Sequence, residues 1–182
     1  MARSTWERIE SGTPTVTLTN LVAATEAVGL DLVLQTYPGR ATSLRDSGQL
    51  GIAQAVASIA DQAWRATFEH RAGDHGEAID LVLWGRDEVL AIEIERMAVD
   101  WQGQYRRASL KRDWLAARTD WPVRLVMVLA DTRRNREALS PFADLLGRTF
   151  PAGSAAVTRA IRDGSRLGSD GLHWFRPRDR TR

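Results

Sequence analysis

Apolar residues recur along the chain at two spacings, one typical of strands and one typical of helices. Residues 79–84 and 89–95 are almost continuous apolar runs that flank a polar stretch, 85–88. This pattern predicts a hairpin of two strands, each buried on both faces. Residues 123–130 give the strongest strand signal in the chain. Two weaker strands are predicted at 64–70 and 172–175.

Apolar residues at helical spacing predict helices in the segments before, between and after these strands. Helices are expected at 50–63, 99–118, 132–146 and 154–163. Pro141 is expected to kink or split the third of them, because proline cannot continue a helix ladder. After residue 48 the order is helix, three strands, helix, strand, helix, helix, strand. That order predicts an α/β fold with a mixed sheet.

The first part of the chain has a different pattern. Residues 3–10 are compatible with a helix that stops at Ser11-Gly12, and Thr17 is predicted to cap a helix that ends at Gly29. Residues 30–37 read as a strand. The predicted organisation is therefore a small, mainly helical module with a strand (1–38), a linker (39–48) and an α/β domain (49–182).

Composition narrows the class of protein. The chain has no cysteine, which excludes a disulfide framework and a thiolate metal site. It has no apolar run near the roughly 20 residues that cross a bilayer, and its first residues are too polar for a secretory signal. We therefore expect a cytoplasmic protein with no membrane partner. Of the 25 basic residues only Lys111 is a lysine, and the net charge of +2 does not by itself indicate a nucleic-acid surface.

One N-terminal motif carries a resemblance. Residues 4–12 read Ser-Thr-Trp-Glu-Arg-Ile-Glu-Ser-Gly, and residues 18–30 follow with a Leu-x-x-Leu-Val-Ala pattern that ends in Gly-Leu. This segment resembles the second half of a Cro/CI-like (XRE family) helix-turn-helix domain. The resemblance implies that Arg3, Ser4 and Arg8 face base edges and that Thr5 lies near a phosphate.

The sequence departs from that family in two ways. Ala2 stands where the family usually has a capping Ser or Thr, and the first helices of the domain are missing before the recognition helix. Trp6, Ile9, Leu21 and Val22 would pack on those helices. We expect either that the true start lies upstream or that this helix pair is the remnant of a DNA reader.

The predicted hairpin carries three carboxylates. Glu93 and Glu95 are two residues apart, so they share a face, and the turn at 85–88 places Asp80 opposite Glu93. Burying such groups unpaired is costly. Two explanations are open: the carboxylates bind a divalent cation, or arginines of the next helix neutralise the glutamates. The arginines concerned are Arg106, Arg107 and Arg112.

The acids and the order of elements together resemble the PD-(D/E)xK restriction-endonuclease-like fold. In that resemblance Asp80 is the aspartate of the motif and Glu93 its second acid. Glu95 stands where the family has its lysine, and Lys111 on the following helix is the candidate substitute. The implied catalytic residues are Asp80, Glu93, Glu95 and Lys111, and the implied metal ligands are Asp80 and Glu93.

These features give a first expectation and two alternatives. We expect a bacterial DNA-binding transcription regulator of the XRE helix-turn-helix type, a homodimer that needs no cofactor, with a nuclease-like but inactive C-terminal domain. The alternative is a Mg²⁺-dependent DNA nuclease of the PD-(D/E)xK type, in phage defence or a toxin–antitoxin pair. A structural relic with neither activity is the third reading. His70, His75 and His173 have no metal-like spacing and are expected at the surface.

Overall fold

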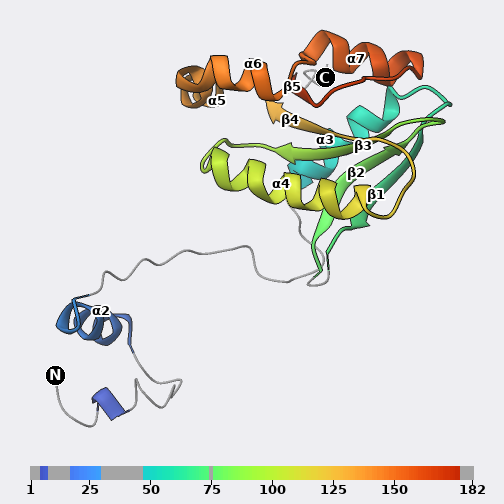
Figure 1. The fold of residues 1–182 in the computed structure, drawn as a ribbon. Helices are drawn as coiled ribbons and strands as arrows, with labels where there is room; N and C mark the ends of the chain where they lie inside the picture. The colour runs from blue at the N-terminus through green and yellow to red at the C-terminus, as the bar shows by residue number, and fades with distance from the viewer. Residues whose placement is uncertain (1–4, 8–16, 30–46, 74–75, 177–182) are drawn as a thin grey trace. The chain divides into compact units, whose positions relative to one another are not determined.

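The computed structural model describes residues 5–7, 17–29, 47–73 and 76–176 (Figure 1). The chain divides into two units, Met1–Thr42 and Ser43–Arg182. In the first unit, residues 5–7 are helical and helix α2 spans Leu18–Ala27.

Helix α2 begins and ends as its sequence predicts. The Thr17 side chain accepts a hydrogen bond from the Asn20 N–H (3.3 Å), and Gly29 follows the helix with a φ of 72° that favours glycine. Of the residues expected to contact DNA, Thr5 lies in the helical segment 5–7. Arg3, Ser4 and Arg8 lie outside the described residues, as does the strand predicted at 30–37.

The second unit is built on a mixed five-stranded sheet in the order β1-β2-β3-β4-β5. The strands are β1 (Arg65–Arg71), β2 (Ala78–Trp84), β3 (Val89–Glu95), β4 (Val123–Ala130) and β5 (Gly171–Phe175). Strand β2 is antiparallel to both of its neighbours, whereas β3, β4 and β5 run parallel to one another. Both strands of the predicted hairpin are buried along almost their whole length, as expected. The α/β class with a mixed sheet is therefore confirmed.

Helices cover both faces of this sheet (Figure 1). They are α3 (Ser47–Ser58), α4 (Trp101–Ala116), α5 (Arg133–Leu139), α6 (Ala143–Thr149) and α7 (Ser154–Asp163). Helices α3 and α7 pack on one face, and α4, α5 and α6 pack on the other. No helix in the described part of the chain combines the length and the apolar character that a bilayer span requires.

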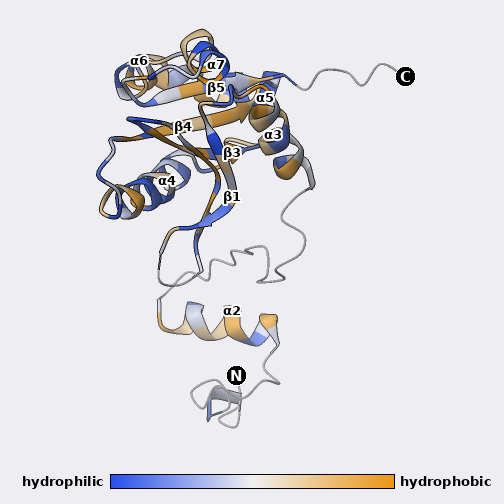
Figure 2. Cartoon of the chain, turned by 90° about the vertical axis from the view of Figure 1, so that its right-hand side faces the viewer, coloured by the Kyte–Doolittle hydropathy of each residue, from blue (hydrophilic) through white to orange (hydrophobic). Residues whose placement is uncertain are grey.

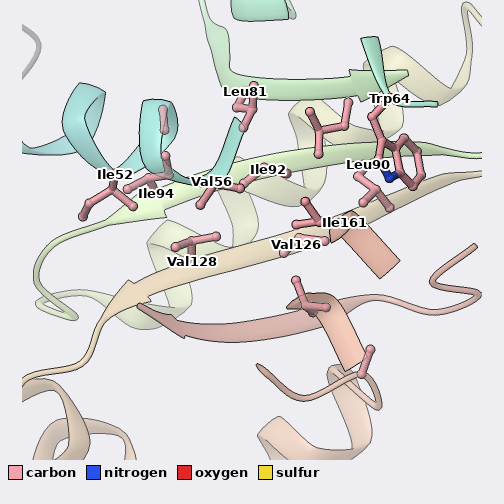
Figure 3. Close-up of a cluster of buried hydrophobic side chains, with 14 residues drawn as sticks. Ile52, Val56, Trp64, Leu81, Leu90, Ile92, Ile94, Val126, Val128 and Ile161 are labelled. Carbon is pink, nitrogen blue, oxygen red and sulfur yellow. The ribbon is translucent and has the colours of Figure 1, made fainter. Parts of the chain in front are cut away.

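The larger hydrophobic cluster lies between the sheet and the α3/α7 layer (Figure 3). Ile52 and Val56 of α3 and Ile161 of α7 contact side chains of the central strands there. Trp64 belongs to this cluster, and its Nε1–H donates to the Ala160 carbonyl of α7 (3.1 Å). Hydrophobic colour accordingly concentrates on the central strands (Figure 2).

Both ends of helix α3 differ from the sequence prediction, whereas the break at Pro141 agrees with it. The sequence predicts a helix at 50–63, whereas α3 spans Ser47–Ser58, so its first two residues lie inside the predicted linker. It ends early because the Asp61 side chain accepts from the Ala63 N–H (2.8 Å) in a tight turn, while the Asp61 N–H donates to the Ile161 carbonyl (2.9 Å). Pro141 splits the helix predicted at 132–146, as expected, into α5, a 3-10 turn (Ser140–Phe142) and α6.

Candidate functional site

Strands β2 and β3 separate at the end of the hairpin where Asp80 and Glu93 lie. Their paired residues run from Trp84–Val89 to Leu81–Ile92. Beyond that point two side chains bind the backbone of Ile94. The Ile94 N–H donates to Asp80 Oδ2 (2.8 Å), and the Ile94 carbonyl accepts from Gln49 Nε2 of α3 (2.8 Å). Asp80 and Gln49 therefore take the place of strand pairing at this edge.

Strand β1 is irregular at the same level. Its pairing with β2 includes Phe68–Leu81 and His70–Ile79, which flank Glu69 and Asp80. Glu69 has a φ of 49°. This left-handed conformation costs a residue with a Cβ about 1–3 kcal/mol, and such backbone strain is concentrated at functional sites.

Two polar side chains of α4 meet the glutamates of β3. Lys111 Nζ lies 2.7 Å from Glu93 Oε2, and Gln104 Nε2 lies 2.7 Å from Glu95 Oε2. Gln104 Nε2 also donates to the Met97 carbonyl (2.8 Å), which fixes the loop between β3 and α4. Gln104 and Lys111 share one face of α4, and Glu93 and Glu95 share one face of β3, so the two pairs of side chains meet between helix and sheet.

The site contains two buried acceptor oxygens that have no hydrogen-bond partner among the described residues. Glu93 is 6% exposed and Gln104 7% exposed. Glu93 Oε1 and Gln104 Oε1 are both buried and have no hydrogen-bond partner among the described residues. A buried group left in this state costs about 1–3 kcal/mol. The site thus has spare capacity to bind a donor or a cation.

The surroundings disfavour negative charge on these acids. Burial raises the pKa of Glu93 to about 8; the Lys111 ammonium opposes this shift, and the Asp80 carboxylate adds to it. Burial likewise raises the pKa of Glu95, against the hydrogen bond from Gln104. The negative charges of Asp80, Glu93 and Glu95 therefore act on one another, and a cation placed among them would relieve the repulsion.

The interpretation in which arginines neutralise the glutamates is wrong for Glu93, whose ion-pair partner is Lys111. Arg112 instead pairs with Asp113 (2.6 Å) and with Asp170 (3.0 Å). Arg107 is close enough to lower the pKa of Glu95 by its charge, but it is not the hydrogen-bond partner of that carboxylate.

The residues present fit a lightly coordinated Mg²⁺ rather than a closed metal cage. In the part of the chain that the structure describes, no group of three His, Cys, Asp or Glu side chains is arranged to hold a metal. Mg²⁺ usually takes one or two carboxylates and completes its shell with water and phosphate oxygens. Glu93 offers one such carboxylate through Oε1, which has no partner among the described residues, and Asp80 is close enough for its charge to act on Glu93.

The sequence pattern alone does not identify Gln104 and Gln49 as residues of the site. A signal for Gln104 was present, because Gln104, Ala108, Lys111 and Leu115 share the face of α4 that turns toward the sheet. Two polar residues on such a stripe indicate polar partners on the strand beneath. The expectation of a surface residue is wrong for His173, whose Nδ1 is buried, whereas His70 is partly exposed on the edge strand β1. Burial lowers the pKa of both. His75 lies outside the described residues.

No known protein family, curated protein or solved structure matches the chain.

Proposed function

We propose that the second unit is a Mg²⁺-dependent phosphodiesterase that acts on DNA. The observation that carries this proposal is the contact between Lys111 and the buried Glu93, beside Asp80 and Glu95 at the opened edge of the sheet. This set offers two carboxylates for a metal ion, an ammonium group for the phosphate and a third carboxylate as a base for water.

The order of elements supports the proposal. Helix α3, strands β1 to β3, helix α4 and strand β4 follow one another as in the PD-(D/E)xK resemblance. In this proposal the family's lysine has moved from β3, where Glu95 stands, to α4, where Lys111 reaches Glu93.

Each residue then has a chemical role. Asp80 and Glu93 would hold Mg²⁺, which when bound polarises the phosphodiester and activates water. Glu95, whose pKa is raised, would accept the proton of the attacking water. Lys111 would stabilise the negative charge that develops on the phosphate, and Gln104 would orient Glu95 through its hydrogen bond.

Cleavage of supercoiled plasmid with Mg²⁺ or Mn²⁺ tests this function. We expect nicking by the wild-type chain and a loss of at least about 100-fold in Glu93→Gln and Asp80→Asn, because each removes a metal ligand. Lys111→Met should lower the rate, because it removes the charge proposed to stabilise the developing negative charge on the phosphate. Asp87→Asn, in the turn at the far end of the hairpin, is the matched control and should cleave normally. Absence of cleavage, or equal cleavage by wild type and Glu93→Gln, would reject the proposal.

A second candidate is the XRE-type regulator, which binds DNA as a homodimer and does not cleave it. Glu95 counts against the nuclease and so favours this alternative. A carboxylate at the lysine position adds negative charge where the phosphate of a nuclease substrate would bind. Its test is selection of a bound DNA sequence followed by Arg8→Ala. That change should weaken specific binding by about 1–3 kcal/mol if Arg8 reads a base. Unchanged affinity would remove the assignment of that helix.

A further inference from the structure

A single carboxylate beyond the end of β4 holds two arginines. Asp131 Oδ1 accepts from Arg136 Nε (2.7 Å), and Asp131 Oδ2 accepts from Arg176 Nε (2.6 Å). The Asp131 side chain is 8% exposed, whereas those of Arg136 and Arg176 are 49% and 82% exposed. Two positive charges against one negative charge leave a positive excess at this surface.

The two guanidinium groups are fixed in orientation. Hydrogen bonds from Arg136 and Arg176 lower the pKa of Asp131 to about 2, so this carboxylate stays ionised at neutral pH. The Arg136 guanidinium also lies over the Trp174 ring, 3.8 Å from its centroid. Asp131 holds each arginine through its Nε, and both side chains remain substantially exposed to solvent. Arginines held in this way lose little freedom when they bind an anion.

This pair lies close to the proposed site. Glu95 pairs with Leu129, and Leu129 pairs with Trp174, so the three side chains share one face of the sheet. Asp131 follows Leu129 by two residues, one strand away from Glu95, which places the two backbones roughly 8 Å apart. The ends of β3 and β4 and helix α5 lie on the same side of the unit in Figure 1. Anything bound at Glu93 and Glu95 would reach Arg136 within the length of a few nucleotides.

We infer that Arg136 and Arg176, held by Asp131, bind the phosphodiester backbone of the DNA strand that enters the Asp80–Glu93 site. This inference rests on the proposed function and names the contact that positions its substrate. Arginine is suited to it, because two parallel N–H groups match two phosphate oxygens. A DNA backbone offers successive phosphates to two neighbouring guanidinium groups.

Binding of a fluorescently labelled duplex in EDTA, followed by anisotropy at several salt concentrations, tests the contact without cleavage. For Arg136→Gln with Arg176→Gln we expect about an eightfold loss of affinity for each phosphate contact at about 100 mM salt. The salt slope should fall by about 0.9 for each contact. Arg118→Gln is the matched control, because Arg118 also lies 3.8 Å over a tryptophan, Trp114. A double variant that binds like the control would overturn the inference.

Asp131→Asn separates positioning from charge. It makes the surface more positive, so a purely electrostatic attraction would strengthen DNA binding. If the arginines must be held in place, the same change weakens binding. Stronger binding would overturn the role given to Asp131. Thermal unfolding of each variant confirms that the fold is kept.

A crosslinking measurement keeps the test independent of any other DNA contact in the chain. Since the chain has no cysteine, Arg133→Cys beside the pair can carry a photocrosslinker, and Arg118→Cys serves as its control. Arg133 is suitable because its side chain is 91% exposed. We expect DNA to crosslink at position 133 and not at position 118. Crosslinking without plasmid cleavage would reject the nuclease but keep this contact, whereas cleavage without crosslinking at 133 would reject the contact alone.

Discussion

Glu88 and Glu93 are buried glutamates of the same hairpin, yet their surroundings differ in one decisive respect. Glu88 is fully buried, and it accepts from Arg124 Nε (3.1 Å) and from the Leu167 N–H (2.6 Å). Its oxygens are used by the fold itself, and they tie the β2–β3 turn to the loop before β5. Glu93 has Lys111 as its partner and one oxygen without a partner among the described residues. The unused oxygen distinguishes a candidate ligand from a structural ion pair.

The raised pKa of Glu93 predicts how stability depends on pH in metal-free protein. Burial raises the pKa of Glu93 to about 8 in the folded state, above its ordinary value of 4.5 in the unfolded chain. The folded state therefore binds more protons between these values, and the free energy of unfolding falls as pH rises through that window. The slope is at most about 1.4 kcal/mol per pH unit.

Urea unfolding in EDTA between pH 5 and pH 8 measures this slope. Glu93→Gln should flatten it and gain stability relative to wild type as pH rises. Some slope should remain, because the pKa of Glu95 is raised in the same direction. Asp87→Asn should keep the wild-type slope. Parallel curves for wild type and Glu93→Gln would contradict the prediction.

At the scale of helices and strands, the local apolar pattern predicts the elements correctly where a strand is buried on both faces. Strands β2, β3 and β4 were predicted correctly because central strands covered on both faces are apolar throughout. The end of α3 was misplaced because it depends on a bond between the Asp61 N–H and the Ile161 carbonyl, 100 positions further along the chain. No local window contains that information.

The candidate site was predictable only in part, for the same reason. The two-residue spacing of Glu93 and Glu95 indicated a shared face, and Lys111 was identified as a side chain on the following helix. Gln49 could not be identified, because its role exists only where β2 and β3 separate and leave the Ile94 carbonyl to a side chain. Departures from regular pairing are properties of the whole sheet.

Gln49 gives a prediction at this scale, since it joins α3 to the opened edge of β3. Gln49→Ala removes the donor of the Ile94 carbonyl, and we expect it to lower the free energy of unfolding by about 1–2 kcal/mol. Gln54→Ala changes an exposed position of the same helix and should cost less than about 0.5 kcal/mol. Equal losses in the two variants, measured by urea unfolding, would show that the Gln49 contact does not stabilise the edge.

At the scale of the whole unit, topology decides which charges meet. Strands β3, β4 and β5 run parallel, so their carboxyl ends lie at one edge, where α/β sheets commonly bind ligands. Glu95 ends β3 and Asp131 follows β4, which brings the acidic site and the arginine pair to the same end. Neither the strand order nor this meeting of charges is contained in the local sequence pattern.

A divalent cation bound at this end of the sheet should stabilise the whole second unit against unfolding. A metal that binds only the folded state stabilises it by about 2.7 kcal/mol when its concentration is 100 times its dissociation constant. Thermal unfolding with MnCl₂ or MgCl₂, without DNA, should show this increase for wild type and for Asp87→Asn. Glu93→Gln and Asp80→Asn should lose it.

The same titration has a pH signature, because Glu93 must release its proton to bind a cation. The metal-dependent rise in unfolding temperature should be larger at pH 8.5 than at pH 6.5. An ion that only screens surface charge would stabilise all four proteins equally and without this dependence. That result would leave Glu93 as a structural partner of Lys111 and would favour the DNA-binding regulator over the nuclease.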